Sequence, residues 1–168
     1  MLAVCVVDQV VKQIMVTTLV PGEPVPVIGD WFRWLLLFNP GAAFSMGQNL
    51  TWLITGVQLA FVVGALIAAP RIRDRWEAVG IALIAGGALG NLIDRLFRPP
   101  GFWFGHVVDY ISIGDFAVFN LADTAINIGL AVFIIGLFLS TGEEKSSEAS
   151  EADSSVSATE APEEKGKR

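Results

Sequence analysis

Long uncharged apolar runs alternate with short polar segments along this chain, a pattern that predicts membrane-spanning helices. Residues 50–69 and 124–142 form runs of twenty and nineteen residues without a charge. Residues 78–93 form a run of sixteen, which its polar ends lengthen. A spanning helix needs about 20 mostly apolar residues, so the first two runs qualify directly and the third qualifies with its ends included.

A fourth apolar run, residues 1–20, is interrupted by Asp8 and Lys12. We predict a first transmembrane helix whose beginning is missing from this chain, because only seven residues precede Asp8. The run lacks the basic flank and small-residue cleavage site of a secretory signal peptide. An interfacial helix is the alternative. Asp8 and Lys12 are four residues apart, so they lie on one helix face, either as a structural ion pair or in support of a site.

The polar segments between the runs predict the orientation. Residues 70–75 contain three arginines, which indicates a cytoplasmic loop. By alternation, both termini are then cytoplasmic, and residues 21–49 and 97–118 lie on the outer side. The aromatic stretch 31–38 predicts one or two short strands of a small sheet at that surface. Residues 98–105 are a Pro- and Gly-rich loop, whose aromatic tip is placed to touch lipid.

Composition supports a membrane protein and separates a tail from it. Hydrophobic residues make up 53% of the chain and charged residues only 17%, against about 25% charged in soluble domains. The predicted organisation is a membrane-embedded domain, 1–142, followed by a disordered cytoplasmic tail, 143–168. The tail carries eight acids and four bases, so it supplies most of the net charge of −6. The acidity therefore says little about a substrate.

Two aspartates, Asp109 and Asp123, lie fourteen residues apart in strongly apolar surroundings. We predict Asp109 on a loop and Asp123 at the head of the last helix. An ionised carboxylate is costly to bury, and an acid inside a membrane protein indicates a functional site. Two adjacent carboxylates cannot both ionise easily, which predicts an acid and a base that share one proton.

Other hydrolytic chemistries find little support in the sequence. His106 is the only histidine and Cys5 the only cysteine, which disfavours a Ser–His or Cys–His nucleophile, a metal hydrolase and an intrachain disulfide. Two alternatives to hydrolysis by this pair of acids remain open at this point. The acids can serve a proton or cation pathway in a transporter or channel subunit, or the polar residues can simply hold helices together in an assembly factor.

Further polar residues are expected to converge on the two acids. The amides of Asn39, Asn91 and Asn120 each lie near a charge or a turn. The small residues of 86–90 allow close helix packing, which should bring Asn91 and Arg95 toward the last helix. Asp94 lies on an adjacent face, where we expect an interfacial or capping charge.

Five short motifs together resemble one known family. They are Asp-Gln-Val-Val-Lys at 8–12, Asn-Pro-Gly-Ala-Ala-Phe-Ser at 39–45, Gly-Gly-Ala-Leu-Gly-Asn-Leu-Ile-Asp-Arg at 86–95, His-Val-Val-Asp-Tyr-Ile at 106–111 and Phe-Asn-Leu-Ala-Asp at 119–123. Their order and approximate spacing resemble bacterial lipoprotein signal peptidase, or signal peptidase II, over roughly residues 1–139. The segment 97–105 looks longer than in many relatives, and its Trp and Phe content leads us to expect that it shapes substrate entry.

The resemblance implies an aspartic endopeptidase of the bacterial inner membrane, with its site toward the outer face. Such an enzyme cuts the signal peptide just before the diacylglyceryl-modified cysteine of a prolipoprotein. The implied fold is an all-α membrane protein, with four transmembrane helices and a small extracytoplasmic β-cradle. The implied partners are prolipoproteins and membrane lipid, with no nucleic acid, no metal or other cofactor, and a monomeric chain. The implied catalytic dyad is Asp109 and Asp123, supported by Asp8, Lys12, Asn39, Gly87, Asn91, Arg95 and Asn120.

Overall fold

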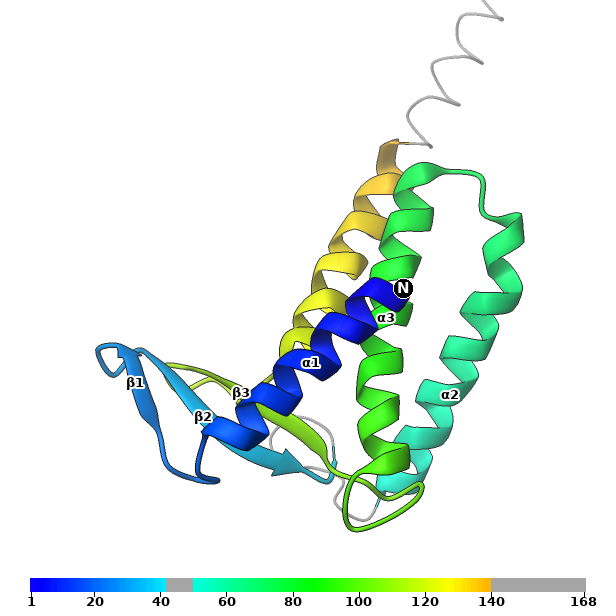
Figure 1. The fold of residues 1–168 in the computed structure, drawn as a ribbon. Coiled ribbons are helices and arrows are strands. Elements are labelled where there is room, and N and C mark those ends of the chain that lie inside the picture. Colours follow the sequence, from blue (N-terminus) through cyan, green and yellow to red (C-terminus); the bar gives the residue numbers. More distant parts are fainter. Residues whose placement is uncertain (42–49, 140–168) are drawn as a thin grey trace, which may run out of the picture.

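The computed structural model describes residues 1–41 and 50–139, which form a bundle of four α-helices with a small sheet at one end (Figure 1). The helices are α1 (Leu2–Thr18), α2 (Thr51–Ala68), α3 (Arg75–Phe97) and a last helix, Leu121–Leu139. A short 3-10 turn, η3 (Ala69–Arg71), extends α2. The predicted tail, 143–168, lies outside the described residues.

Three of the helices are long and apolar enough to cross a membrane, as the sequence predicts. These are α2 with its extension, α3 and the last helix. The fourth helix, α1, has 17 residues, or about 26 Å at a rise of 1.5 Å per residue, against about 30 Å for a bilayer core. It lies against α3, with its first residue near the middle of that helix (Figure 1). The predicted fold class is confirmed.

Close approach of the helices depends on glycines of α3, as the small residues there predict. A Cβ at Gly90 would lie 2.5 Å from Asp8 Oδ2 on α1. A Cβ at Gly87 would run into the backbone carbonyl oxygen of Ala122 on the last helix. These two glycines face different neighbours, so α3 packs against α1 on one side and against the last helix on another.

The sheet contains β1 (Val25–Ile28), β2 (Phe32–Asn39) and β3 (Val107–Ile113), paired antiparallel in the order β1-β2-β3. The predicted aromatic strand is β2. The prediction that Asp109 lies on a loop is wrong, because Asp109 is in β3, where it pairs with Leu37 of β2. The buried side chains of Leu36, Val108 and Tyr110 pack against α1 and hold the sheet on the bundle.

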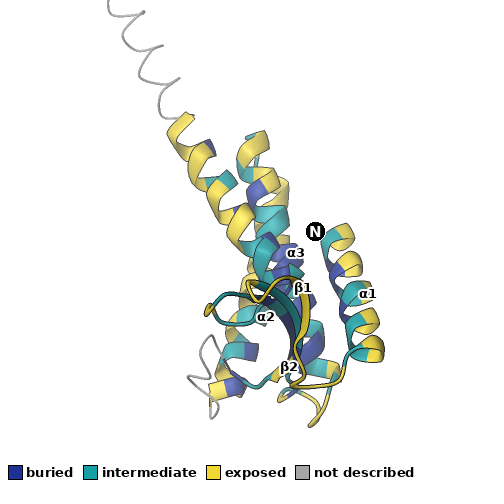
Figure 2. Cartoon of the chain, turned by 90° about the vertical axis from the view of Figure 1, so that its left-hand side faces the viewer, coloured by how far each residue is buried: buried dark blue, intermediate teal, exposed yellow. Residues whose placement is uncertain are grey.

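The sheet marks one end of the bundle, called the sheet end here; the arginine-rich connection from α2 to α3 lies at the opposite, far end (Figure 1). The outward faces of the helices are exposed, while buried residues gather where α1, α3 and the sheet meet (Figure 2). Large apolar residues such as Val57, Ile135 and Phe138 are among those exposed. This distribution suits helices that face lipid, with polar groups placed inside at the sheet end.

The loop between α3 and β3 is anchored on α2 at the sheet end. Trp103 Nε1 donates to the backbone oxygen of Trp52 at 3.1 Å, and Thr55 Oγ1 donates to the backbone oxygen of Trp103 at 3.0 Å. Phe102 and Phe104 beside it are exposed. The predicted aromatic tip therefore has two exposed rings and one ring fixed to α2. A role in substrate entry stays a prediction.

Candidate functional site

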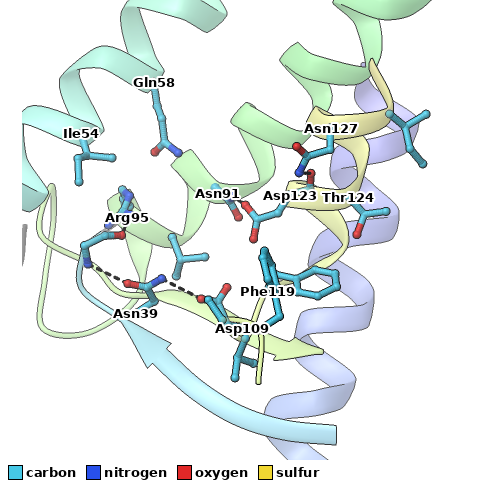
Figure 3. A pocket seen from close by; sticks show the side chains of 16 residues that line it. Asn39, Ile54, Gln58, Asn91, Arg95, Asp109, Phe119, Asp123, Thr124 and Asn127 are labelled. Atoms are coloured by element: carbon cyan, nitrogen blue, oxygen red, sulfur yellow. Dashed lines mark hydrogen bonds between the residues drawn. The ribbon is translucent and has the colours of Figure 1, made fainter. Parts of the chain in front are cut away.

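A cavity of about 560 Å³ lies at the sheet end, bounded by α2, α3, β3 and the last helix. Figure 3 shows polar side chains from all four elements around it. They include Asp109 and Asp123, the two acids expected to meet. The rest of the lining is largely apolar, from residues such as Ile54, Val107 and Phe119. The cavity thus combines two carboxylates with an apolar wall.

Asp109 is 3% exposed and accepts hydrogen bonds on both carboxylate oxygens. Asn120 Nδ2 donates to Oδ1 at 2.6 Å, and Asn39 Nδ2 donates to Oδ2 at 2.9 Å. Burial raises the pKa of Asp109 to about 7, and the negative charge of Asp123 acts in the same direction. The two amide donors lower this pKa but do not reverse the shift. Asp109 therefore changes protonation near neutral pH.

Asp123 is held at the first turn of the last helix by a reciprocal cap. Its backbone N–H donates to Asn120 Oδ1 at 3.0 Å, and its Oδ2 accepts from the backbone N–H of Asn120 at 3.2 Å. This exchange satisfies helix N-terminal donors in the manner of a capping box. Asn91 Nδ2 donates to the other oxygen, Oδ1, at 2.8 Å. Asn120 thus binds both acids, through its side chain to Asp109 and through its backbone to Asp123.

A second group of charges, called the ion-pair cluster here, lies on the α1 side of α3. Lys12 Nζ is 2.9 Å from Asp8 Oδ2 and 2.7 Å from Asp94 Oδ2, and all three side chains are fully buried. Arg98 Nε is 2.5 Å from Asp94 Oδ1. The predicted pair of Asp8 and Lys12 is confirmed. The expectation for Asp94 was wrong, because Asp94 is buried at the centre of this cluster.

The ion-pair cluster fixes the backbone beside each acid of the cavity. Asp8 Oδ1 accepts from the N–H of Ala122, the residue before Asp123, at 3.0 Å. Asp94 Oδ2 accepts from the N–H of Val108, the residue before Asp109, at 3.2 Å. One buried carboxylate therefore anchors the main chain at each cavity acid. Sequence spacing gave no sign of this arrangement, since it joins residues 114 and 14 positions apart.

Asn91 connects the two groups. Its Oδ1 accepts from Lys12 Nζ at 2.7 Å, while its Nδ2 donates to Asp123. A protonated lysine has only donors, so its bond fixes which end of the Asn91 amide faces Asp123. Asn120 Nδ2 also approaches Asn91 Oδ1, at 3.3 Å. The orientation of this amide is thus set by the ion-pair cluster.

Arg95 and Gly87 complete the predicted set. The Arg95 guanidinium is buried and donates from Nη2 to the backbone oxygen of Gly41 at 2.8 Å, at the end of β2. Gly87 allows the last helix to lie against α3. The amides of Asn39, Asn91 and Asn120 donate directly to the two acids. Arg95 lines the same cavity and donates to the backbone instead. Asp8 and Lys12 lie behind them, in the ion-pair cluster.

Three polar residues near the site were not singled out from the sequence. Gln58 and Asn127 line the cavity, and Arg98 belongs to the ion-pair cluster. Gln58 carried a usable signal, because it is the only amide in the uncharged run 50–69. Within residues 1–41 and 50–139, no group of three or more His, Cys, Asp or Glu side chains is placed to hold a metal ion.

Comparison with known proteins identifies consistent relatives. The family model described as Signal peptidase (SPase) II matches residues 1–139. The chain is 46% identical over 134 residues to a lipoprotein signal peptidase of Mycobacterium avium (strain 104), covering 80% of this chain and 73% of that protein. It is also 46% identical over 132 residues to a lipoprotein signal peptidase of Mycolicibacterium smegmatis (strain ATCC 700084 / mc(2)155), covering 79% and 56%.

A solved structure agrees with these relatives. A bacterial membrane enzyme determined by the in meso method at 2.3 Å resolution superposes with a TM-score of 0.71. It is 31% identical, and the match covers 83% of this chain and 85% of that one. The likeness therefore extends over the helices and the sheet together.

Proposed function

We propose that Asp109 and Asp123 are the catalytic pair of this chain, which belongs to the signal peptidase II family of aspartic peptidases. The family match shows the general activity, removal of signal peptides from prolipoproteins, and so favours a peptidase over a transporter subunit or an assembly factor. Our proposal adds the residues, the bond that is cut and the orientation in the membrane. The observation that carries it is that two acids, the buried Asp109 and the half-buried Asp123, share Asn120 at the wall of one cavity.

The chemistry proposed is general acid–base hydrolysis by a pair that shares one proton. The ionised carboxylate takes a proton from a water molecule, whose oxygen attacks the carbonyl carbon of the scissile peptide. The protonated carboxyl gives its proton to the carbonyl oxygen. Collapse of the tetrahedral intermediate then breaks the C–N bond, and the leaving nitrogen takes a proton from the pair. The raised pKa of Asp109 supports this cycle, because that group can hold and release a proton near neutral pH.

The neighbouring amides keep the pair in place without fixing its charge. Asn39 and Asn91 each give one N–H to one acid, and Asn120 gives an N–H to both. A neutral donor orients a carboxylate but favours its ionised form less strongly than a cation would. We infer that this is why amides, rather than lysine or arginine, contact the two acids directly.

We place the sheet end at the outer face of the bacterial inner membrane. The connection at the far end carries Arg71, Arg73 and Arg75, which supports a cytoplasmic location for it and for both termini. The bond we propose for cleavage is the one just before the diacylglyceryl-modified cysteine of the prolipoprotein. The cavity lies between α2 and the last helix at the sheet end, so this orientation would put it where such a substrate leaves the bilayer. A monomer remains our expectation.

The direct test replaces each acid by asparagine. Asp109→Asn and Asp123→Asn should each lower cleavage of a lipidated prolipoprotein by at least about 10²-fold, since each removes a proton-transfer group. The assay uses full-length protein in proteoliposomes, with product followed by mass change. Asp115→Asn is the matched control, because Asp115 is an exposed acid at the same end. Cleavage near the wild-type rate by either cavity variant would overturn the assignment.

A further inference from the structure

Gln58 is the one polar side chain of α2 that the structure leaves unexplained. The helix has no charged residue, and apart from the Trp52 indole its other polar side chains are the hydroxyls of Thr51 and Thr55. Both hydroxyls are used, since Thr51 Oγ1 donates to the backbone oxygen of Pro40 and Thr55 Oγ1 donates to the backbone oxygens of Thr51 and Trp103. Gln58 Oε1, in contrast, is buried and has no hydrogen-bond partner among the described residues.

The position of this orphan oxygen points to a ligand. Only three buried side-chain N or O atoms in the described part of the chain lack a partner: Arg33 Nε, Gln58 Oε1 and Arg95 Nε. Two of these three, on Gln58 and Arg95, belong to residues that line the cavity of the two acids (Figure 3). One is an acceptor and the other a donor. Unpaired buried polar groups are rare because they are costly, so two around one cavity indicate a missing partner with both functions.

A peptide backbone has both functions, and a membrane peptidase must handle backbone that is not helical. A peptide cut within a spanning segment must be extended at the scissile bond, which frees N–H and C=O groups from their helical partners. In hydrocarbon those groups have no water to bind, so side chains must satisfy them. Gln58 meets this need from α2, on the opposite wall of the cavity from Asp123 (Figure 3).

We propose that Gln58 Oε1 accepts a hydrogen bond from a backbone N–H of the signal peptide, on the N-terminal side of the cleaved bond. Arg95 Nε donates to a carbonyl oxygen of the same unwound stretch. The side of the bond follows from depth. Figure 3 shows Gln58 farther from the strands than Asp109 and Asp123, and a signal peptide that spans the membrane approaches the acids from that direction. This assignment rests on the proposed function and its orientation, and it makes Gln58 a binding residue.

The first test removes the amide but keeps the side-chain length. Gln58→Met should raise KM for a synthetic diacylglyceryl-modified prolipoprotein peptide about 5-fold, the size of one net hydrogen bond, while kcat stays within about twofold. Gln13→Met is the matched control, because Gln13 is an exposed amide on α1, and its KM should not change. Unchanged KM in Gln58→Met would overturn the proposal.

Thermal unfolding in detergent separates binding from a structural role. If Gln58 held helices together, Gln58→Met would lower the Tm. Because the amide oxygen is buried without a partner, the variant should instead keep or raise the Tm. A lowered Tm would contradict the proposal whatever the kinetics.

Ester substitution in the substrate identifies the N–H itself. Peptides in which one backbone N–H upstream of the cleaved bond is replaced by an ester oxygen are compared in a double-mutant cycle. One position should lower kcat/KM about 5-fold with wild-type enzyme and have little effect with Gln58→Met. If the loss in kcat/KM from the ester and the loss from Gln58→Met combined independently at every position, Gln58 would contact no substrate N–H. These outcomes are distinct from failure of the proposed function, which would appear as cleavage by Asp109→Asn or Asp123→Asn.

Discussion

Two pairs of aspartates flank α3, and the groups that contact them differ. Asp8 and Asp94 lie within 2.9 Å of the Lys12 ammonium, and Asp94 also meets Arg98. Within residues 1–41 and 50–139, Asp109 and Asp123 form no ion pair and accept their hydrogen bonds from neutral amides and backbone N–H groups. A cation within contact favours the ionised carboxylate, whereas an amide orients it with weaker bias. The same residue type therefore forms structural ion pairs on one side of α3 and, in our proposal, carries the chemistry on the other.

The two pairs of aspartates lie apart in the fold, and hydrogen bonds connect them at a few points. Three members of the ion-pair cluster, Asp8, Lys12 and Asp94, are fully buried between α1 and α3, and none of them lines the cavity. The cluster is connected to the proposed catalytic pair through the backbone of Val108 and Ala122 and through the Asn91 amide. The carboxylates of the cluster thus hold the backbone beside the two cavity acids, while the Lys12 ammonium contacts Asp8, Asp94 and Asn91.

The largest effect should come from removing the cation that serves both Asp8 and Asp94. Lys12→Met leaves two fully buried carboxylates with less compensation and should lower the free energy of unfolding by about 3–5 kcal/mol. Thermal unfolding in detergent measures this loss. Arg73→Met, which removes an exposed cation at the far end, is the control and should have little effect. Equal Tm values for the two variants would mean that the cluster contributes no stability.

An intermediate effect on stability is expected from Asp109, where substitution should stabilise the fold rather than destabilise it. Burial raises the folded-state pKa of Asp109 to about 7, well above the ordinary value of about 4, so the fold is most stable at low pH and loses stability as the pH rises from about 4 to about 7. Asp109→Asn removes this penalty and should stabilise the protein by about 2–4 kcal/mol at pH 8 relative to its effect at pH 5. The comparison of Tm at the two pH values checks this. A gain of the same size from Asp115→Asn, an exposed acid, would show that burial is not the cause.

The smallest effect concerns the pH profile of cleavage. A pair that shares one proton gives a bell-shaped dependence of rate on pH, with macroscopic limbs that belong to the pair. Asn39 donates to Asp109 and lowers its pKa, so Asn39→Ala should move the limb near pH 7 upward by about 0.5–1 unit. Rates of proteoliposome cleavage between pH 4 and pH 10 would reveal the shift. A limb that moves down, or a flat profile, would contradict the coupled pair.

Much of this molecule could be predicted from its sequence because apolar runs and short motifs are local signals. The spans needed only run length, and the aromatic stretch predicted β2. The resemblance in five motifs predicted the family and its activity, and the comparisons confirm both. Convergence of Asn39, Asn91, Arg95 and Asn120 on the two acids followed from the cost of burying polar groups.

The failures arose where a residue's environment depends on distant parts of the chain. Residues 107–110 of β3 are all buried, so the alternation that reveals a half-exposed strand is absent, and Asp109 was expected on a loop. Asp94 was expected at an interface because its partner Lys12 lies 82 positions earlier. Gln58 was passed over because run length counts charges, and an amide does not interrupt the run. In each case tertiary packing decided the outcome.

The Asn91 amide has a consequence for inhibitors of this enzyme. One end of the amide accepts from Lys12 and the other donates to Asp123, so a residue without an amide or an equivalent donor and acceptor loses a contact on at least one side. Aspartate at this position would keep the acceptor but place a third carboxylate beside Asp123, and leucine would satisfy neither neighbour. A compound that draws its binding energy from Asn91 therefore meets a residue that the protein cannot exchange at low cost. Resistance would have to arise at the apolar wall of the cavity, where residues such as Ile54 tolerate replacement by others of similar volume.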